Sequence, residues 1–457
     1  MMNKGSHSFD VVVMGAGVAG TTAAWLFASR GFRTALVEAR RLGQAGARWV
    51  NGMPMRVFDE VGLERPSGEE LLDTGVDTHM FDHSDRRIFT SRNNPMCNVD
   101  MSLLVDRLHE LAKRAKVEVF DSVRLDGVEF EGERPRQVRL RLPHKGAVTL
   151  RGQLFVDATG MLGELRRRVP ALQRDCPSLR TGEVCTAAQM VLEIKDKAGA
   201  RDQLAQWGVE AGETVNWLGV EAGYSTRMIS FDSNLDHAHI VTGNVLSPGG
   251  KNGLAMAREV QERYRFFGSV VRSGEGLIPI RRPYERLGVP GAVLLGDAAC
   301  MVYSAHGSGV GTGMLAARAL VESVAEGEDL GSLESVWAYE HRFHQGLGAM
   351  LGSVAVATQM FRQLSSSQVD MMVRHGIFGV STFESGLSLK TPLPTPDLAF
   401  GLARLSAAAP ALGARVALGG SMVAPVAGAY RLHPRAVSPR RWRLWARMVR
   451  GLMGGSA

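Results

Sequence analysis

The chain opens with two short apolar runs that flank a stretch of helical spacing. Residues 9–14 read FDVVVM, a continuous apolar run rich in β-branched residues, which is typical of a strand buried in a parallel sheet. Helical spacing follows from residue 18 to about residue 30, and residues 34–37 form a second apolar run. This order predicts a β–α–β unit near the amino terminus.

Four later segments extend the pattern. Residues 99–116 repeat leucine and alanine on one helical face, and residues 117–150 alternate as in a β-meander. Several strand-like stretches occupy residues 181–248, and we interpret them as an antiparallel sheet that roofs a substrate cavity. Helical spacing returns from residue 333 to about residue 380.

We therefore predict an α/β fold with three parts. The first part is discontinuous, because the segment after residue 276 returns to it. The parts are a domain built on the β–α–β unit over residues 1–85, 99–180 and 277–330, an α+β substrate domain with an antiparallel sheet over residues 181–276, and a helical carboxyl-terminal region over residues 331–457.

The carboxyl terminus predicts a basic amphipathic helix. Its apolar and basic side chains fall on opposite sides, with Trp442, Trp445, Met448, Val449 and Leu452 on one and Arg440, Arg443, Arg447 and Arg450 on the other. Two interpretations are open. The helix either docks peripherally on an anionic membrane or a carrier protein, or packs its apolar side on its own domain with the arginines in solvent.

Composition limits the class of protein. The chain has 457 residues, of which 45% are hydrophobic and 22% charged, as in a globular protein of two or three domains. Seven arginines and no acid or lysine follow residue 430, which accounts for the net charge of +7. The rest of the chain is formally neutral, which argues against a nucleic-acid-binding protein. We see no signal peptide, no long uncharged apolar run, no CxxC pair and no metal-ligand spacing. We expect a cytoplasmic protein with reduced thiols, no bound metal and no transmembrane helix.

A glycine-rich motif follows the first predicted strand directly. In GAGVAG, Gly15 permits the tight turn, Gly17 lets the backbone approach a pyrophosphate, and Gly20 allows close packing of helix and strand. The following helix points its N-terminus at the phosphates, and Glu38 ends the second strand where an acid accepts bonds from ribose hydroxyls. Because Glu38 repels a 2′-phosphate, the motif predicts the adenosine half of FAD or NAD.

A second glycine motif separates FAD from NAD. Residues 293–313 read VLLGDAACMVYSAHGSGVGTG, in which a buried strand ends at Gly296 and Asp297 and a glycine-dense turn opens a helix. Here the chain resembles the superfamily of para-hydroxybenzoate hydroxylase, geranylgeranyl reductase and the flavin-dependent halogenases, whose Rossmann-like FAD domain is of the glutathione-reductase-2 type. The resemblance implies that Asp297 binds the flavin ribityl chain. It also implies that a helix N-terminus stabilises reduced flavin near N1/O2, through the backbone of Gly307, Ser308, Gly309 and Val310.

Three further residues are candidates for the site. Residues 154–160 read LFVDATG and resemble the DG element of the same superfamily, so Asp157 is either a cofactor residue or a turn cap. Arg48 lies in a loop that these folds place against the adenosine and the flavin edge. His306 stands near the expected flavin ring, where an imidazole serves as proton donor or acceptor, or else caps the next helix or faces solvent.

One motif departs from the resemblance. Geranylgeranyl reductases carry a YxWxFP-like motif and halogenases carry WxWxIP ahead of the GD motif. Residues 274–279 read GEGLIP, so Gly274 and Gly276 stand at both aromatic positions. This departure argues against halogenation and against prenyl reduction of the archaeal type.

We predict an FAD-dependent oxidoreductase that acts on an apolar or aromatic small molecule. Hydroxylation by a monooxygenase ranks first, reduction of an unsaturated isoprenoid-like lipid second and halogenation third, and a non-redox, lycopene-cyclase-like use of FAD is a further alternative. The flavin carries the chemistry, so the sequence names no catalytic pair of side chains. Because no second GxGxxG is present, we expect NAD(P)H to bind transiently as electron donor, or a partner flavin reductase to supply the electrons.

Overall fold

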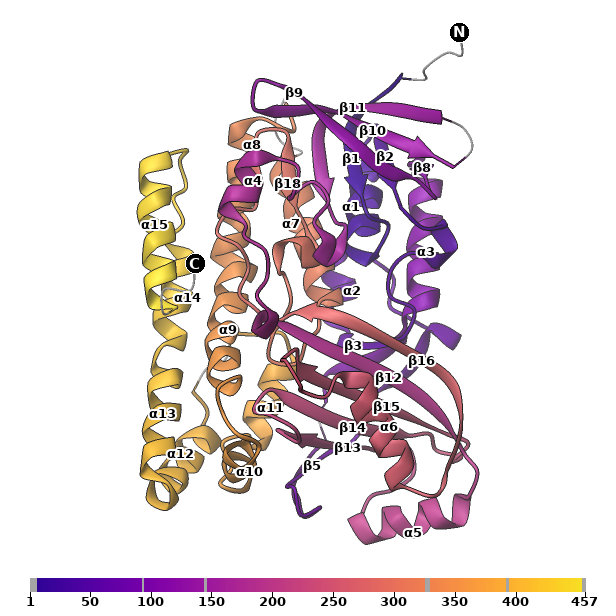
Figure 1. Cartoon of the computed structure of the whole chain (residues 1–457), viewed down its shortest axis with the longest axis vertical. Coiled ribbons are helices and arrows are strands. Elements are labelled where there is room, and N and C mark those ends of the chain that lie inside the picture. Colours follow the sequence, from indigo (N-terminus) through magenta and orange to yellow (C-terminus); the bar gives the residue numbers. More distant parts are fainter. Residues whose placement is uncertain (1–5, 93, 144–145, 325–328, 392–393, 454–457) are drawn as a thin grey trace.

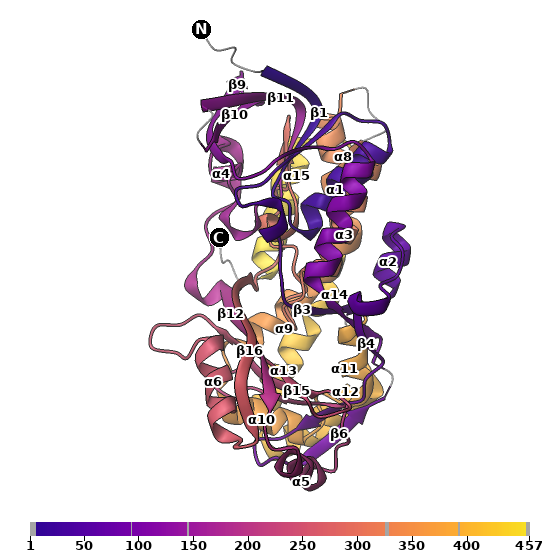
Figure 2. The ribbon, with the colours of Figure 1, turned by 90° about the vertical axis from the view of Figure 1, so that its right-hand side faces the viewer.

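The computed structural model describes residues 6–92, 94–143, 146–324, 329–391 and 394–453. Figure 1 shows the nucleotide-binding sheet at the top, a second sheet below it, and the carboxyl-terminal helices along the left margin. Figure 2 presents the same arrangement from the side, with helix α3 (Met101–Arg114) in front of α1 (Val18–Ser29). The predicted α/β class, with an antiparallel substrate sheet and a helical carboxyl-terminal region, is confirmed.

The upper sheet has a parallel core. Its order is β17-β18-β11-β1-β2-β8, in which β18, β11, β1, β2 and β8 run parallel, and β10 and β9 extend β11 as an antiparallel meander. The strands are β1 (Ser6–Met14), β2 (Thr34–Val37), β8 (Glu118–Phe120), β9 (Arg124–Glu131), β10 (Arg134–Leu142), β11 (Gly146–Asp157), β17 (Gly288–Val289) and β18 (Ala292–Leu294).

The continuous apolar run of β1 is explained by burial on both faces. Val11 and Val13 belong to the core under helices α1 (Val18–Ser29), α3 (Met101–Arg114) and α7 (Val310–Val324). Val12 and Met14 face the opposite way, into a core shared with the β9–β10 meander. A strand covered on both sides has no solvent face, so its sequence does not alternate.

The lower sheet forms the body of the substrate domain. Its order is β16-β12-β15-β14-β13-β5-β6, and helices α5 (Lys197–Trp207) and α6 (Gly253–Arg263) pack on it around buried Trp207 and Trp217. The strands are β5 (Thr78–Phe81), β6 (Arg87–Ser91), β12 (Val184–Ile194), β13 (Thr214–Leu218), β14 (Ser225–Phe231), β15 (His237–Val245) and β16 (Phe267–Pro279). The β5–β6 hairpin comes from outside the segment 181–276, and β5 joins the sheet by parallel pairing with β13.

A three-stranded sheet connects the two larger ones. It consists of β3 (Val50–Pro54), β7 (Met96–Asp100) and β4 (Leu71–Thr74), with β7 in the centre. Helix α2 (Arg56–Val61) follows β3, and α4 (Pro170–Asp175) precedes β12. This small sheet carries the chain from the second strand of the nucleotide-binding unit to helix α3.

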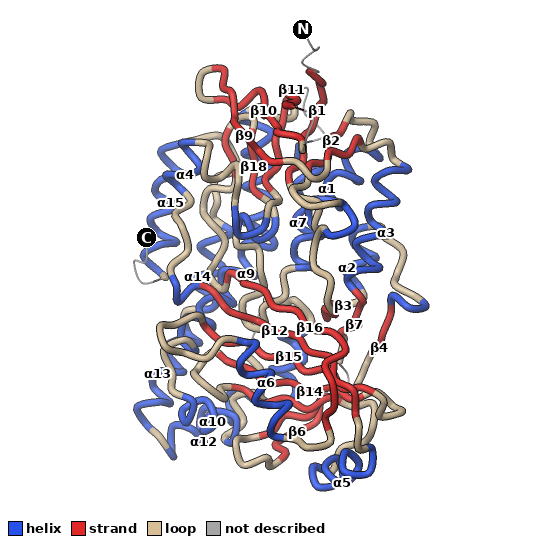
Figure 3. The backbone as a smooth tube through the Cα atoms, turned by 45° about the vertical axis from the view of Figure 1, so that its right-hand side comes forward, coloured by secondary structure: helices blue, strands red, loops and turns tan. Residues whose placement is uncertain are grey.

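The carboxyl-terminal helices begin at strong sequence signals. Thr395 and Ser438 each cap a helix whose next residue is proline, and Ser365 forms a capping box with Gln368. Figure 3 shows these helices as one stack beside both sheets. They are α8 (Leu333–Phe343), α9 (Ala349–Phe361), α10 (Ser366–Arg374), α11 (Val380–Leu387), α12 (Pro396–Ala408), α13 (Pro410–Ser421), α14 (Val423–Arg431) and α15 (Pro439–Leu452), with a π-helical turn at His344–Gly348.

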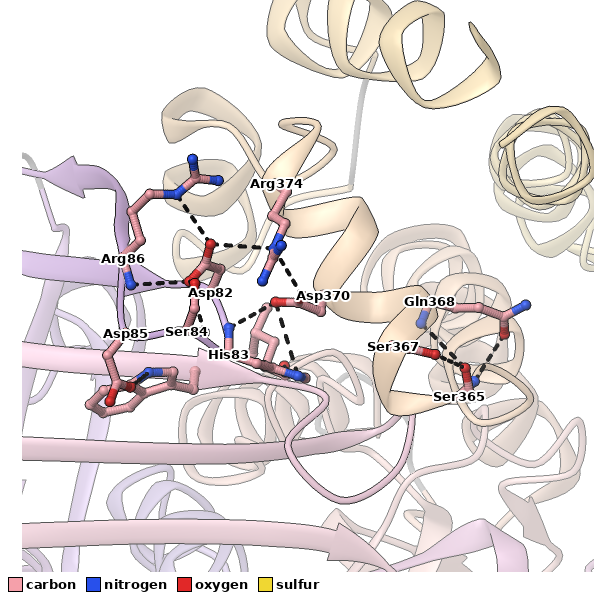
Figure 4. Close-up of polar contacts among 12 residues, drawn as sticks. Asp82, His83, Ser84, Asp85, Arg86, Ser365, Ser367, Gln368, Asp370 and Arg374 are labelled. Atoms are coloured by element: carbon pink, nitrogen blue, oxygen red, sulfur yellow. Dashed lines mark hydrogen bonds and ion pairs between the residues drawn. The ribbon is translucent and has the colours of Figure 1, made fainter. Parts of the chain in front are cut away.

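Polar contacts around the buried carboxylate of Asp82 fasten this stack to the lower sheet (Figure 4). In the β5–β6 turn, the fully buried carboxylate of Asp82 accepts hydrogen bonds from Ser84 and Arg86 and lies 3.3 Å from Arg374 Nε of α10. Asp370 Oδ1 accepts a bond of 2.8 Å from the His83 backbone N–H. Burial alone would raise the pKa of Asp82, but these bonds and the Arg374 charge outweigh burial and lower it.

Helix α15 settles how the predicted amphipathic tail is oriented. Trp442, Trp445 and Val449 are buried against α9 and α14, and the Trp445 indole donates to the Ala429 carbonyl at 2.8 Å. The guanidinium of Arg286 lies 3.7 Å from the centre of the Trp442 ring. The apolar side therefore packs on the protein itself, and most of the arginines point outward.

Candidate functional site

At two of the three glycines of the first turn, close backbone contacts leave no room for a side chain. Gly15 has φ +103°, and a Cβ there would lie 2.2 Å from the Ala158 carbonyl oxygen. A Cβ on Gly20 would lie 2.0 Å from the Gly15 carbonyl oxygen. At Gly17, by contrast, the only near atom is the Gly46 Cα at 3.7 Å, so the backbone there is open to a ligand. Helix α1 begins at Val18 without a side-chain cap, which leaves its first N–H groups for phosphate oxygens.

Glu38 is held at this turn. Its Oε2 accepts a bond of 2.9 Å from the Ala16 N–H, and its Oε1 accepts one of 3.0 Å from the Arg40 N–H. A carboxylate oxygen has more than one acceptor position, so both oxygens keep capacity for ribose hydroxyls. The sequence analysis missed His109 of α3, whose Nε2 lies 2.9 Å from the Ala16 carbonyl oxygen. Burial lowers the pKa of His109, so it donates as a neutral imidazole and fixes the turn from behind.

Asp157 supports the site from inside the fold. Its carboxylate is fully buried and accepts hydrogen bonds from the Thr159 backbone and hydroxyl and from the N–H groups of Leu165 and Arg166, at 2.6–3.1 Å. The following residue, Ala158, is the one that Gly15 approaches. Asp157 thus caps the turn after β11 and holds that turn against the first glycine motif.

Asp297 has the opposite environment. Its carboxylate accepts no hydrogen bond from any residue in the described part of the chain. Burial raises the pKa of Asp297 to about 6. A Cβ on Gly309 would lie 3.0 Å from Asp297 Oδ1, so only glycine leaves room beside the carboxylate. Helix α7 begins next to it at Val310, with no acid in its first turn. A carboxylate without partners beside a helix N-terminus fits the hydroxyls of a ribityl chain and the anionic edge of a reduced flavin.

The two glycine motifs meet in space. A Cβ on Gly296 would lie 3.2 Å from the Ala19 Cβ, and a Cβ on Gly313 would lie 3.0 Å from the same atom. Helices α1 and α7 therefore pack closely through Ala19, with their N-termini beside one another. This neighbourhood is the one required if a single extended FAD lies across both motifs.

The loop after β2 closes the site on the side of the lower sheet. Ser308 Oγ lies 3.4 Å from the Gly52 carbonyl oxygen, which brings β3 beside the start of α7. Arg48 forms an ion pair of 3.1 Å with Asp106 of α3 and also bonds to the Ala45 carbonyl. Its side chain lines a cavity of about 370 Å³ between this loop and the lower sheet. Arg48 is therefore anchored at the cavity wall, and direct contact with FAD stays a prediction.

Trp49 fills the space above the two unexpected glycines. A Cβ on Gly276 would lie 2.7 Å from the Trp49 indole, and a Cβ on Gly274 would lie 3.2 Å from it. Gln189 of β12 holds the loop in place by accepting a bond of 2.7 Å from the Val50 N–H. The strand aromatics that the family motifs carry are thus replaced in space by an indole from another part of the chain. Sequence reasoning noted the glycines but had no signal for their long-range partner.

His306 packs on a neighbouring aromatic ring just before the second glycine turn. Its ring stacks on Tyr303 with centroids 4.7 Å apart, and it bonds to the Gly386 backbone. The side chain is exposed, so a place beside the flavin ring stays a prediction. The protein atoms around the ring desolvate it and lower the pKa of His306 to about 4, so the imidazole is uncharged at neutral pH.

Known proteins match this architecture. Residues 10–169 match the family described as FAD dependent oxidoreductase. Digeranylgeranylglycerophospholipid reductase 2 of Methanopyrus kandleri is 24% identical over 80% of this chain and 89% of its own length. A geranylgeranyl bacteriochlorophyll reductase-like protein of Thermoplasma acidophilum superposes with a TM-score of 0.72 at 18% identity, over 91% of this chain and 100% of its own. PqsL, a probable FAD-dependent monooxygenase of Pseudomonas aeruginosa, gives a TM-score of 0.56 at 18% identity, over 78% and 97%.

The geometry and the comparisons agree on the cofactor and the class of enzyme. Two glycine motifs lie beside one another, the first with Glu38 and the second with Asp297, and contact of these acids with the ribose and the ribityl chain stays a prediction. The chain is an FAD-dependent oxidoreductase, similar over four-fifths of its length to digeranylgeranylglycerophospholipid reductase 2 and similar in fold to a geranylgeranyl bacteriochlorophyll reductase-like protein.

Proposed function

We propose that the enzyme reduces carbon–carbon double bonds in an unsaturated, isoprenoid-like lipid. The observation that carries this proposal is the similarity to digeranylgeranylglycerophospholipid reductases over about four-fifths of the chain, which takes in the substrate sheet as well as the FAD domain. The sequence alone ranked hydroxylation ahead of reduction. The relatives favour the reverse order, and we follow them.

The residues at the site fit a reaction in which the protein contributes position and charge rather than a catalytic acid–base pair. Bound FAD, once reduced, would supply a hydride to one alkene carbon, and a proton that comes ultimately from solvent would complete the addition at the other. Asp297 holds the cofactor by its ribityl hydroxyls, and the N-terminus of α7 stabilises negative charge at the flavin edge. Neutral His306 orients a polar group without adding charge to the cleft.

Trp49, packed over Gly274 and Gly276, gives one wall of the cavity an apolar surface, while Arg48, Arg272 and Glu275 make other parts of the lining charged. An indole offers a broad apolar face to an alkene or prenyl chain.

Electron supply belongs to the same proposal. The chain has one GxGxxG motif, so NADH or NADPH binds transiently or a separate flavin reductase delivers the electrons. A titration of the purified protein with each nucleotide, followed by bleaching of the flavin absorbance, distinguishes these sources.

The test is anaerobic single turnover. FAD-loaded protein is photoreduced without oxygen and mixed with a geranylgeranyl-bearing lipid, and the products are analysed by mass spectrometry. The proposal expects reoxidation of the flavin coupled to a gain of two hydrogens per double bond, and no reoxidation with the fully saturated lipid. Product that appears only after oxygen is admitted, carrying an added oxygen atom, would identify a monooxygenase instead.

A further inference from the structure

The carboxyl-terminal helices carry an unusual distribution of charge. From residue 398 to residue 457 the chain holds nine arginines and no aspartate, glutamate or lysine. Helices α12–α15 lie along one margin of the molecule in Figures 1 and 3. We call the outward side of these helices the carboxyl-terminal face.

The arginines of this face are available for an external partner. Six of them form no ion pair with any residue that the structure describes, and they are Arg431, Arg435, Arg440, Arg441, Arg443 and Arg447. All six are exposed. Their direction is fixed, because the opposite side of α15 is anchored by buried Trp442 and Trp445 and by the contact of Arg450 with Glu285.

Large apolar side chains stand among the arginines. Leu418, Leu432 and Leu444 are 68%, 67% and 61% exposed. The 22-residue segment Pro410–Arg431, which joins α13 and α14, is apolar and long enough to cross a membrane, yet only 28% of its most apolar stretch is buried. It is nevertheless held on the protein, since Val426 and Tyr430 are buried against α9. The other side of this segment therefore lies at the molecular surface. Exposing large leucine side chains to water is unfavourable, so such a surface usually marks a place that another molecule covers.

A groove on the same face combines both kinds of side chain. Its volume is about 870 Å³, and it lies between the end of α14 and α15. Arg431, Arg435 and Arg441 line it together with Leu432 and Leu444. Guanidinium groups beside leucines complement a phosphate head with an acyl chain next to it.

We propose that the carboxyl-terminal face docks on a membrane surface that contains anionic phospholipids. Arginines attract the negative surface, and the leucines enter the boundary between headgroups and acyl chains. A second copy of the chain fits less well, because two such faces would bring unpaired arginines together. An acidic carrier protein would satisfy the arginines but would leave Leu418 on α13 uncovered. The proposal does not depend on the reaction, because membrane binding is measured without substrate.

The test uses the full-length, FAD-loaded protein and flotation with two kinds of vesicle. One contains phosphatidylcholine alone, and the other contains in addition about a third of phosphatidylglycerol, an anionic lipid. We expect at least about tenfold tighter binding to the anionic vesicles, with the difference reduced at high salt.

Three variants make the test specific. The triple variant Arg441→Glu, Arg443→Glu, Arg447→Glu is expected to lose at least about tenfold in affinity for anionic vesicles. The double variant Leu432→Ser, Leu444→Ser is expected to weaken binding while keeping the preference for anionic lipid. The matched control changes three exposed arginines at the α5–α6 end of the molecule, as Arg201→Glu, Arg258→Glu, Arg265→Glu, and is expected to bind like the parent.

Each variant is checked for flavin content and melting temperature, so that a folding defect is not mistaken for lost binding. Equal binding to both vesicles, or equal losses in the triple variant and its control, would overturn the proposal. So would a stable dimer that dissociates in the triple variant, or binding to an acidic carrier protein with none to vesicles.

Discussion

Asp297 offers a sharp test, because burial of its charge should lower the free energy of unfolding of the FAD-free protein. Burial raises the pKa of this carboxyl from 3.8 to about 6 in the folded state. Ionisation is therefore harder when folded than when unfolded. The resulting loss of stability is absent below about pH 4, grows between about pH 4 and pH 6, and is complete above pH 6.

The size of the effect follows from the two pKa values. Each pKa unit corresponds to about 1.4 kcal/mol, so the penalty reaches about 3 kcal/mol at pH 7.5 and about 1.5 kcal/mol at pH 5. Asp297→Asn removes the charge at nearly constant shape and should stabilise the FAD-free protein by these amounts. With an unfolding entropy of about 1 kcal/mol per degree for a chain of this length, the melting temperature should rise by about 3 °C at pH 7.5. Binding of FAD should weaken about tenfold or more, because a charge-assisted bond to the ribityl hydroxyls becomes a neutral one.

The assay is thermal unfolding of FAD-free protein at both pH values, with FAD affinity measured by quenching of flavin fluorescence. Asp157→Asn is the matched control, since that aspartate is also buried but accepts four hydrogen bonds. The amide nitrogen of an asparagine side chain cannot accept hydrogen bonds, so the free energy of unfolding of the control variant should fall by about 2 kcal/mol. The reasoning would be refuted by Asp297→Asn variants that are destabilised, or whose gain does not change with pH.

Two further predictions concern packing and the attachment of the helices. Gly276→Ala should cost about 1–3 kcal/mol of stability because the new methyl meets the Trp49 indole, and the cost should largely vanish in a Trp49→Ala background, as a double-mutant cycle in urea would show. Asp82→Ala should cost about 2 kcal/mol at pH 7, because the partly buried N–H groups of Ser84 and Arg86 and the guanidinium of Arg374 lose their shared acceptor. Since the folded pKa of Asp82 is lowered, its contribution is present above about pH 4 and is lost as the pH falls below that value, so parent and variant melting temperatures should converge in acid; a constant difference would count against this account.

The local parts of the site were predictable from the sequence because each depends on a short stretch of chain. Gly15, Gly17 and Gly20 sit where strand, turn and helix follow one another, and Asp297 ends a strand before a glycine turn. Such features need only the immediate backbone to form. The fold class followed from the same kind of evidence, since the unalternating β1 indicates burial on both faces.

The features that depend on contacts between residues far apart in the chain could not be predicted from the sequence. Trp49 lies on Gly274 and Gly276 across more than two hundred residues, and no periodicity marks that contact. The hairpin β5–β6 joins the lower sheet through a parallel pairing with β13, and nothing in the sequence of the hairpin itself indicates this partner. For Asp157, the sequence left two roles open, and the number of donors around its carboxylate became visible only in the fold.

The central claim is that one FAD lies across both glycine motifs, and Gly17→Val tests it most directly. A Cβ at Gly17 meets only the Gly46 Cα at 3.7 Å, so the protein without FAD should still fold, while the pyrophosphate loses its approach to the backbone. Parent protein reconstituted with FAD should bind one equivalent and turn yellow, and the variant should stay colourless with a similar melting temperature in the FAD-free state. A parent protein that takes up no FAD, or a variant that binds it equally well, would contradict the account.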